Sequence, residues 1–501
     1  MAVETEPIRW GTAGARWTLA ATVGGSGVAM LDATTVNVAL PALGEDLGAS
    51  VADLQWTINA YTLTVASLVL LAGSLADRFG RRRVFLIGVG WFAAASLLCA
   101  LAPTVQVLIL ARGLQGIGGA LLTPGSLAIL QSSFAAEDRA RAVGAWSGLG
   151  GLAAALGPVL GGFLVSQASW RWIFLINLPV ALAVVLITVR HVPETRAPDQ
   201  VPGFDIAGSI LAIVALGATS WAFITSGERG LGTAVLVAGA VGLVSLLVFV
   251  AVERRSPHPL IPPRIFHSRQ FTGANLVTFL VYGGMGGVFF LFVVYLQQVA
   301  GFSPVEAGSA LLPITALMLL LSARAGALAQ RIGPRKPMTF GPVVIAAGML
   351  LMTGIGEGSE YLSSVLPAAV VFGLGLALTV APLTAAVLAA AEDALTGVAS
   401  GVNNAVSRAA GLLAVAVLPV VAGLSGDAYR DPAAFTSGFR VAITLSAALV
   451  AGGGVLAWFT ITDDVLQKKT DRKLPPGGRA RTHCAVDGSP LQPPPETAPA
   501  A

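Results

Sequence analysis

The sequence contains little charge, few histidines and almost no cysteine. Charged residues make up 11% of its 501 residues, against roughly 25% in an ordinary soluble domain. Cys99 lies in an apolar run and Cys484 near the C-terminus, so a disulfide framework is excluded. The four histidines are too scattered for a metal site. What the chain has instead is 55% hydrophobic residues, which indicates an integral membrane protein.

Apolar runs long enough to cross a bilayer, which takes about 20 residues, recur along the chain. A segment inside lipid must satisfy its backbone hydrogen bonds internally, and these Gly-rich runs lack the short alternating pattern of barrel strands. We therefore expect helices. The sequence predicts fourteen of them, at 17–41, 55–76, 84–102, 106–130, 142–165, 172–190, 206–226, 232–252, 273–299, 307–330, 338–356, 361–386, 397–424 and 440–461.

The positive charges lie mainly on one side of these spans. If the N-terminus is cytoplasmic, the even-numbered connections and both tails hold 23 of the 30 Lys and Arg residues, and three lie within helices. The odd-numbered connections hold only Arg171, Arg229, Arg430 and Arg440. The positive-inside rule then predicts a multi-pass protein of the cell membrane with both termini cytoplasmic. Anionic inner-leaflet lipid explains the net charge of +4, so no nucleic-acid partner is expected.

A charged turn separates the second and third spans. It reads Gly73-Ser-Leu-Ala-Asp77-Arg78-Phe-Gly80-Arg81-Arg82-Arg83, and residues 326–336 repeat its spacing with Gln330 in place of the Asp. The turn resembles the cytoplasmic signature loop of the major facilitator superfamily of secondary transporters. The resemblance implies two homologous halves and a latch in which Asp77 caps a helix of the opposite half, the one that begins near residue 396. The latch residues would be Gly73, Asp77, Arg78, Gly80, Arg81 and Arg82.

The expected fold is therefore an all-α membrane protein with the major facilitator fold, in which a two-helix linker hairpin joins two six-helix bundles. The predicted boundaries are 1–16 for a cytoplasmic segment, 17–190 for the first bundle, 191–272 for the linker, 273–461 for the second bundle and 462–501 for a disordered cytoplasmic tail. The two linker spans carry no internal charge, so we expect a peripheral hairpin outside the transport path. We expect a monomer.

Asp32 is the one acidic residue predicted in the middle of a span. A carboxylate there costs about 2.5–3.5 kcal/mol on insertion scales, so it needs a partner, a water-filled cavity or a function. Residues 31–41 read Leu-Asp-Ala-Thr-Thr-Val-Asn-Val-Ala-Leu-Pro and resemble the first-helix motif of the fourteen-helix drug:proton antiporter branch. The resemblance implies that Asp32 is a protonation site that often also meets cationic substrate. Hydrogen bonding for helix packing alone is the alternative.

The fourth span offers a counter-charge. Arg112, Gln115, Gly116 and Gly119 share one helical face, and the Gly residues let another helix approach closely. The pattern resembles the fourth-helix motif R-x-x-Q-G of the family, whose Arg is thought to assist proton transfer. The alternative is an Arg that extends to the membrane interface.

The fifth span carries small residues and one proline. Gly157, Pro158, Gly161 and Gly162 resemble the antiporter motif G-x-x-x-G-P-x-x-G-G, which in the family separates exporters from uptake symporters. Ala153 replaces one expected Gly, which weakens the inference of antiport without removing it. Generic Gly-rich helix packing is the alternative.

Further polar residues of the spans are candidates for a central cavity, although polar side chains also hold membrane helices together. These candidates are Thr35, Gln55, Asn59, Tyr61, Gln115, Tyr282, Gln298, Asn403 and Asn404, with Arg408 beside them.

The sequence thus predicts a proton-coupled antiporter that exports amphipathic drugs or antibiotics by alternating access. It would be driven by the proton gradient without a cofactor, and its partners would be the substrate, protons and membrane lipid. One alternative is a proton symporter that imports a small nutrient, against which the fifth span argues. Another is a non-transporting sensor, which would have no use for Asp32 facing Arg112. An enzyme is not expected, because no nucleophile with its base and no metal cluster is apparent.

Overall fold

The computed structural model describes residues 7–135, 137–195, 205–256, 259, 261–391, 396–424 and 431–466. Most of the predicted C-terminal tail and the first six residues lie outside this part. The described residues form helices, with one isolated bridge between Ile8 and Phe134. Twelve helical units are long and apolar enough to cross a membrane, and α2 and α13 are two further long helices. The prediction of fourteen spans in an all-helical membrane fold is confirmed.

The first bundle contains five of the twelve units together with α2. Thr12, Ser50 and Thr104 cap the starts of α1, α2 and α4 with their side-chain oxygens. Because these caps and polar end turns continue the helices past their apolar centres, the helices are longer than the apolar runs that predicted them. The elements are α1 (Ala13–Leu47), α2 (Val51–Phe79), α3 (Arg81–Ala100), α4 (Val105–Ser133), α5 (Arg139–Gln167), α6 (Trp172–Leu175) and α7 (Asn177–His191).

The second bundle repeats this plan. Its second predicted span is interrupted, since a short helix capped by Ser303 precedes the long one, and the sixth span of the first bundle is likewise broken at Ile176. Pro179 and Pro313 lie in the first turns that follow these breaks, where a missing N–H costs little. The elements are α10 (Arg269–Gln298), α11 (Pro304–Ser309), α12 (Leu312–Ile332), α13 (Arg335–Met352), η2 (Tyr361–Val365), α14 (Leu366–Ala389), α15 (Thr396–Val421) and α16 (Pro432–Thr460), with short turns η1 (Pro263–His267) and η5 (Asp463–Val465).

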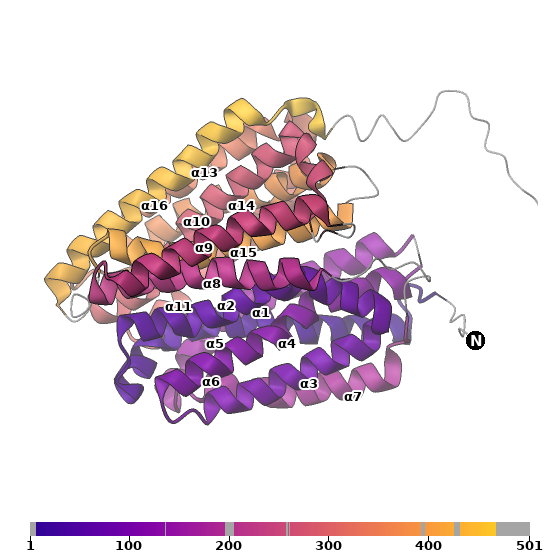
Figure 1. Cartoon of the computed structure of the whole chain (residues 1–501), viewed down its shortest axis with the longest axis horizontal. Helices are drawn as coiled ribbons and strands as arrows, with labels where there is room; N and C mark the ends of the chain where they lie inside the picture. The colour runs from indigo at the N-terminus through magenta and orange to yellow at the C-terminus, as the bar shows by residue number, and fades with distance from the viewer. Residues whose placement is uncertain are drawn as a thin grey trace, which may run out of the picture.

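The two bundles lie side by side with their helices running in similar directions (Figure 1). The start of α1 and the end of α16 lie at the same end of the molecule, which we call the termini face; the opposite end is the far face. Large apolar side chains such as Leu110, Leu182 and Phe459 are exposed on the outer surface. Such a surface is suited to lipid rather than water.

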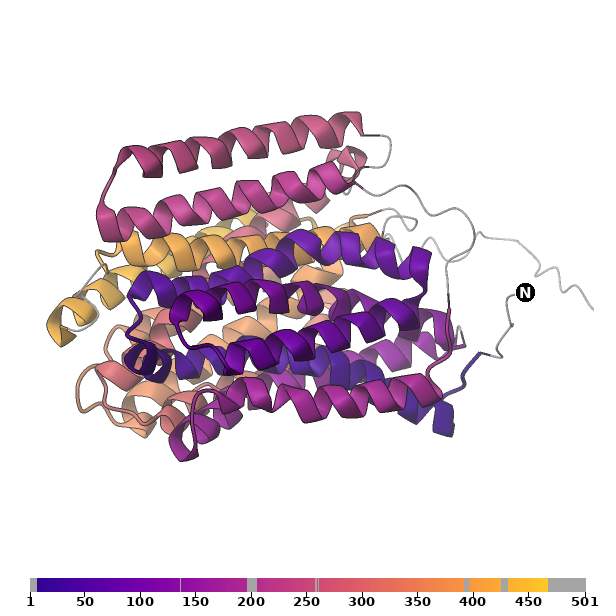
Figure 2. The same ribbon diagram turned by 60° about the horizontal axis from the view of Figure 1, so that its bottom comes forward.

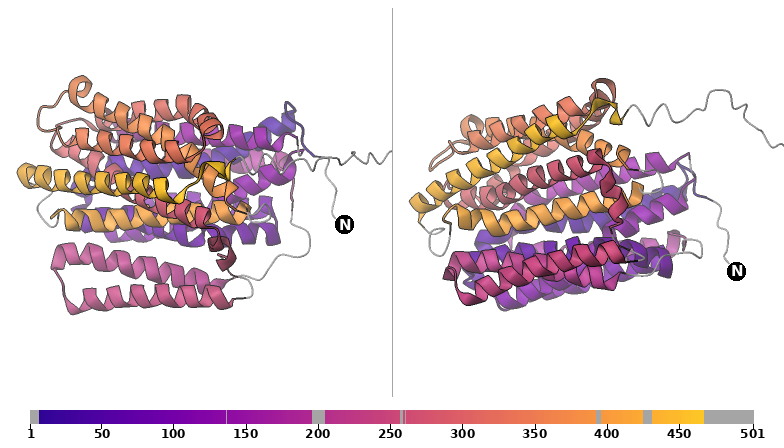
Figure 3. Two further views of the ribbon diagram at one scale, coloured as in Figure 1. Left: turned by 90° about the horizontal axis from the view of Figure 1, so that it is seen from above. Right: turned by 45° about the horizontal axis from the view of Figure 1, so that its top comes forward.

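Two further helices, α8 (Ile206–Arg229) and α9 (Thr233–Arg255), form a hairpin at the edge of the molecule (Figures 2 and 3). α8 packs against α2 of the first bundle and α15 of the second, and α9 packs against α8. Ile224 of α8 is buried with Ala52 and Ala416, one residue from each bundle. The hairpin therefore covers the α2–α15 seam, while exposed residues of α9 such as Leu243 and Leu247 face outward.

An acidic residue that follows the sixth span caps the third helix of the first bundle. Gly80 ends α2 with φ of +107°, a conformation that glycine adopts readily. The carboxylate of Glu194 lies beside it and accepts hydrogen bonds from the backbone N–H groups of Arg82 and Arg83, at 3.0 and 3.1 Å. This carboxylate satisfies free N–H groups at the positive end of α3.

The second bundle has the same device. Gly333 ends α12 with φ of +85°, and Asp463, which follows α16, lies beside it. Its Oδ1 atom accepts a hydrogen bond from the backbone N–H of Arg335 at 3.2 Å, at the start of α13. The repeat detected in the two charged turns thus extends to the acids that cap them.

Candidate functional site

The structure joins Asp32 and Arg112 in the interior of the first bundle. Asp32 of α1 is fully buried and Arg112 of α4 is 1% exposed. The Nη1 atom of Arg112 lies 2.5 Å from Oδ2 of Asp32. A buried pair of this kind is neutral overall, which lowers the cost of placing either charge in a membrane.

Three amide and hydroxyl side chains complete the network around the carboxylate. Gln115 and Asn177 donate hydrogen bonds to Oδ1 of Asp32 at 2.9 and 3.1 Å. The hydroxyl of Ser96 accepts a further hydrogen bond from each amide. The carboxylate is thus held by donors from α4 and α7, while Ser96 of α3 orients the two amides.

The guanidinium of Arg112 is fixed on its other sides as well. Its Nε donates to the carbonyl oxygen of Thr57 in α2 at 3.1 Å, and Nη1 also donates to Oε1 of Gln115. The centre of the guanidinium lies 4.4 Å from the ring centroid of Tyr61 and 5.7 Å from that of Phe174. These contacts exclude water and favour the cation.

Several members of this network were not predicted. Asn177 is a single Asn in an otherwise apolar span, which was a usable signal. Ser96 and Phe174 carried none, because serine and phenylalanine are common in membrane helices. Of the predicted cavity residues, Gln115 and Tyr61 belong to the network instead.

The small residues of α5 face two helices. Gly157 and Gly161 lie against α1, where an added Cβ would meet Leu31 O and the backbone of Thr35 at 3.1 Å. Gly162 faces the other bundle, because a Cβ there would meet the backbone of Pro304 and Val305 in α11. α5 therefore connects the helix of Asp32 to the second bundle near the far face.

Two details of this crossing explain local sequence choices. Gly308 of α11 lies against the carbonyl of Pro158, so small residues meet backbone from both sides. Ala153 departs from the family motif, and its Cβ lies 3.4 Å from the position of a Cβ added at Gly27 of α1. The extra methyl is accommodated because its neighbour is glycine.

A cavity of about 1030 Å³ lies between the bundles, bounded by α1, α5, α10, α12 and α14. Its lining is largely apolar and includes Phe289, Val293 and Met318. It extends to Ser147 and Leu388, which lie toward the ends of α5 and α14 at the termini face. Its polar lining residues are Thr34, Asn37, Ser147, Thr315, Ser322 and Thr384.

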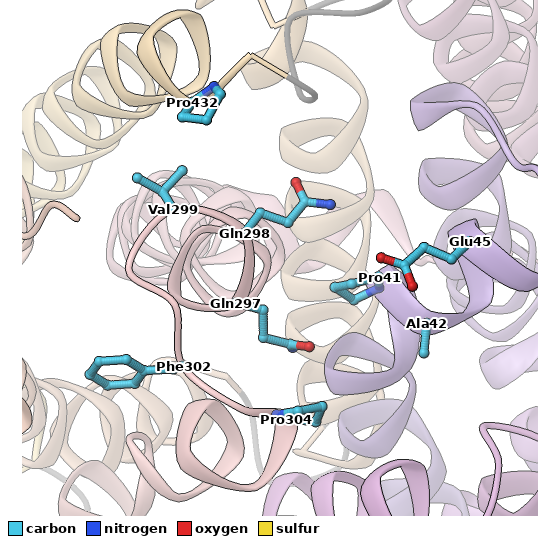
Figure 4. Close-up of a pocket in the computed structure, with 9 residues that line it drawn as sticks. All are labelled: Pro41, Ala42, Glu45, Gln297, Gln298, Val299, Phe302, Pro304 and Pro432. Carbon is cyan, nitrogen blue, oxygen red and sulfur yellow. The ribbon is translucent and has the colours of Figure 1, made fainter. Parts of the chain in front are cut away.

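A smaller pocket of about 500 Å³ lies at the far face (Figure 4). Pro41 and Glu45 of α1 face Gln297 and Gln298 of α10 across it. Gln297 donates a hydrogen bond of 3.1 Å to the carbonyl oxygen of Val38, which itself lines the larger cavity. This contact between the bundles separates the two spaces.

A second hydrogen bond joins the bundles on the opposite side. Nε2 of Gln55 in α2 donates to the carbonyl oxygen of Val415 in α15 at 2.9 Å. Like the Gln297 contact and the α5–α11 crossing, it lies toward the far face. At the termini face, by contrast, a Cβ added to Gly73 would meet nothing within 4 Å. The described structure is closed at the far face, and its large cavity extends toward the termini face.

The other predicted residues are distributed as follows. Of the cavity candidates, Gln298 lines the smaller pocket, and the rest line neither space. Thr35 is buried against α5, and Asn403 donates to Oγ1 of Thr278 at 2.7 Å within the second bundle. Asn59 is fully buried, Tyr282 is half-buried and Asn404 is exposed.

Thr34 and Asn37 line the cavity where Thr35 was expected. Thr35 was chosen because it shares a helical face with Asp32. The face of α1 that carries Asp32 and Thr35 points into the first bundle, so both side chains are buried. Thr34 and Asn37 lie on the adjoining face of α1, which lines the cavity.

The latch is described only in part. At the start of α3, the backbone N–H groups of Arg81 and Arg82 donate to Thr195 and Glu194, and the guanidinium of Arg82 donates to the carbonyl oxygen of Val192. The side chain of Asp77 and those of residues 396 and 397, its expected partners, lie outside the described atoms.

Comparison with known proteins identifies the family. The family model described as Major Facilitator Superfamily matches residues 22–415. The chain belongs to the Major Facilitator Superfamily. Solved structures agree on the fold: a POT family transporter in complex with thioalcohol conjugated peptide superposes with a TM-score of 0.66 at 14% identity, covering 87% of this chain and 94% of that one. At this identity the likeness shows the fold alone.

Curated relatives of this superfamily member are resistance and export proteins. A puromycin resistance protein of Streptomyces alboniger is 35% identical over 91% of this chain and 92% of its own length. A tetracenomycin C resistance and export protein of Streptomyces glaucescens is 36% identical, over 84% and 79% of the two chains. A multidrug resistance protein of Mycobacterium tuberculosis is 35% identical, over 83% and 77%.

Proposed function

We propose that this transporter exports amphipathic drugs or antibiotics from the cell in exchange for protons. The curated relatives support export, and the large apolar cavity suits an amphipathic compound. We place the termini face in the cytoplasm, because the signature turn and most positive charges lie there. The cavity then takes up substrate from the cytoplasmic side, and the far face is external. Proton flow alone drives the cycle, with no cofactor.

The observation that carries proton coupling is the buried Asp32 network. All described donors to its carboxylate favour the charged form, so binding a proton there removes the charge that holds Nη1 of Arg112. The loss frees α1 to shift relative to α4. Because α5 packs on α1 through Gly157 and Gly161 and on α11 through Gly162, a shift of α1 is passed to the closure at the far face.

The cycle then alternates between two states. With Asp32 ionised, the far face is closed and the cavity accepts substrate from the cytoplasm. Proton binding from outside loosens the network and favours opening of the far face, where substrate leaves. Release of the proton to the cytoplasm restores the network. Asp32 contributes through charge rather than by contact with substrate, because Arg112, Gln115 and Asn177 already occupy its carboxylate.

The test is transport in everted membrane vesicles that contain the full chain. Acidification of the lumen should drive accumulation of an amphipathic dye such as rhodamine B, and addition of the dye should release protons from the vesicles. Collapse of the pH gradient by nigericin should stop both. Movement of dye and protons in the same direction would instead indicate a symporter, and a chain that moves neither would be a sensor.

A further inference from the structure

Another arginine lies in the middle of a long helix of the other bundle. Arg408 occupies the middle of α15 and is half-buried. Within the described residues, no hydrogen bond or ion pair joins its guanidinium to the protein, whereas Arg112 is held by Asp32, Gln115 and Thr57. An uncompensated charge at this depth is costly, so it marks a functional position by default.

The position of Arg408 on the helix directs it to the seam between the bundles. Val415 follows it by two helical turns and therefore shares its face. The carbonyl of Val415 accepts the hydrogen bond from Gln55, so this face of α15 meets α2. Arg408 also lies close enough to Tyr61 of α2 for the two side chains to interact electrostatically.

Unsatisfied polar groups lie along the same seam. Asn59 follows Gln55 by about one turn on α2, is fully buried, and has no described partner for either its amide nitrogen or its oxygen. Asn404 precedes Arg408 by about one turn on α15 and is exposed. Buried polar groups are nearly always paired, so a fully buried Asn without a partner indicates that something else supplies one.

The protein itself does not supply the missing negative charge within the described residues. Asp32 is committed to Arg112, and the two neutralise each other. The α8–α9 hairpin covers the seam from outside with apolar residues such as Ile224. The described residues therefore leave the guanidinium of Arg408 free to pair with an anionic group of a ligand.

We infer that Arg408 binds a carboxylate, or a similarly delocalised oxyanion, of the exported compound. The planar guanidinium presents paired N–H donors that match two carboxylate oxygens. Asn404, which is exposed one turn before Arg408 on α15, lies beside the site and binds a neighbouring polar group of the same molecule. This inference rests on the proposed export function and adds to it a substrate class: apolar compounds that carry an acidic group.

Two dyes of nearly identical shape test this assignment. Rhodamine B carries a free carboxylate, and its ethyl ester does not. Each would be titrated into the purified full-length chain in phosphatidylcholine nanodiscs, at constant chloride and without anionic lipid, with fluorescence anisotropy as the readout. We expect the wild-type chain to bind rhodamine B more tightly than the ester.

The variants separate charge from geometry. Arg408→Gln should raise the Kd for rhodamine B by about 10- to 100-fold, the range expected for a charge-assisted hydrogen bond, and leave that for the ester unchanged. Arg408→Lys should retain part of the affinity for rhodamine B, because lysine keeps the positive charge but lacks the paired N–H donors of the guanidinium. Arg324→Gln, which changes an exposed arginine within α12, is the matched control and should change neither Kd.

Three results would overturn the assignment: equal wild-type affinity for both dyes, equal losses for both dyes in Arg408→Gln, or full retention of rhodamine B binding in that variant. If Arg408→Gln fails to elute as a single species, the two Kd values of Arg408→Lys are compared with those of the wild-type chain instead. If Arg408 had only a structural role, Arg408→Lys would keep the wild-type ratio between the Kd values for the two dyes, and this result would overturn the assignment. The binding measurement needs no pH gradient. If proton coupling were disproved, the binding test of Arg408 would therefore still be valid.

Discussion

The centres of the two bundles differ although their frameworks repeat. In the first bundle, a charged pair with Gln115 and Asn177 fills the interior. In the second bundle, no ion pair is found among the described interior residues; Asn403 donates to Thr278, and toward the far face Tyr295 stacks on Phe439 with centroids 3.9 Å apart. Arg408 of the second bundle lies at the seam, and no ion pair or hydrogen bond to its guanidinium is found among the described residues.

This difference indicates a division of labour. Features that satisfy backbone groups, such as the acids that cap α3 and α13, are retained in both bundles because each helix start needs them. A fully buried ion pair is described in only one, because every additional buried ion adds a desolvation cost. Under the function proposed above, the first bundle responds to protons, and the second provides a rigid wall and a contact for substrate.

The largest expected effect is at the pair itself. Asp32→Asn should abolish accumulation of dye in response to a pH gradient, because the amide cannot bind and release a proton. It also leaves Arg112 buried without its counter-charge, at a cost of about 3–5 kcal/mol. Transport would be measured in everted vesicles. Stability would be followed with a thiol-reactive dye that labels buried Cys99 on unfolding, in a Cys484→Ser background.

Two companion variants separate the effects on stability and transport. Asp32→Asn combined with Arg112→Gln removes both charges and should recover stability without recovering transport. Asp32→Glu should retain part of the activity with a changed pH profile. Gradient-driven accumulation of dye by Asp32→Asn would remove Asp32 from the mechanism.

The crossing of α5 and α11 comes next. Gly162→Val should clash with the backbone of Pro304 and Val305, at a cost of about 1–3 kcal/mol, and so disfavour closure of the far face. Labelling of Thr315→Cys by a membrane-impermeant maleimide added outside should then rise. Gly144→Val is the control, because a Cβ there meets nothing within 4 Å. Equal labelling in both variants would show that the crossing does not close the far face.

The two capping acids allow a direct comparison between the bundles. Glu194 accepts two backbone N–H groups and Asp463 one. Glu194→Gln should therefore lower the unfolding temperature more than Asp463→Asn, with losses in the range of about 0.5–2 kcal/mol. Thermal unfolding with the Cys99 label would measure both. A larger loss for Asp463→Asn would contradict the assignment of these acids as caps.

The smallest effect is expected at the latch. If Asp77 caps a helix of the opposite half when the cytoplasmic side is closed, Asp77→Asn removes a charge–dipole contact of about 0.3–2 kcal/mol and should reduce transport without loss of inserted protein. Gln330 occupies the matching position of the second half, so Gln330→Asn should have no effect on transport. Normal efflux by Asp77→Asn would leave the turn as a topological anchor only.

Much of the site was accessible from the sequence because membrane insertion penalises buried charge. Asp32 and Arg112 stood out for that reason, and the structure brings them together. The small residues of α5 also predicted close packing. Helical periodicity shows which residues share a face, but it does not show which helix that face meets. For that reason Thr35 was favoured over Thr34, and Glu194 was assigned only to a domain boundary.

The sequence by itself determined the class, the number of spans and the position of the buried charges, because length, hydropathy and the cost of an ion in lipid are local properties. Tertiary structure alone decided the partners: Asn177 and Ser96 around Asp32, α11 against α5, and the seam that leaves Arg408 without a counter-ion. These depend on how α1, α4, α7 and α15 rotate and cross. Such rotations are set by side-chain packing between helices far apart in the chain.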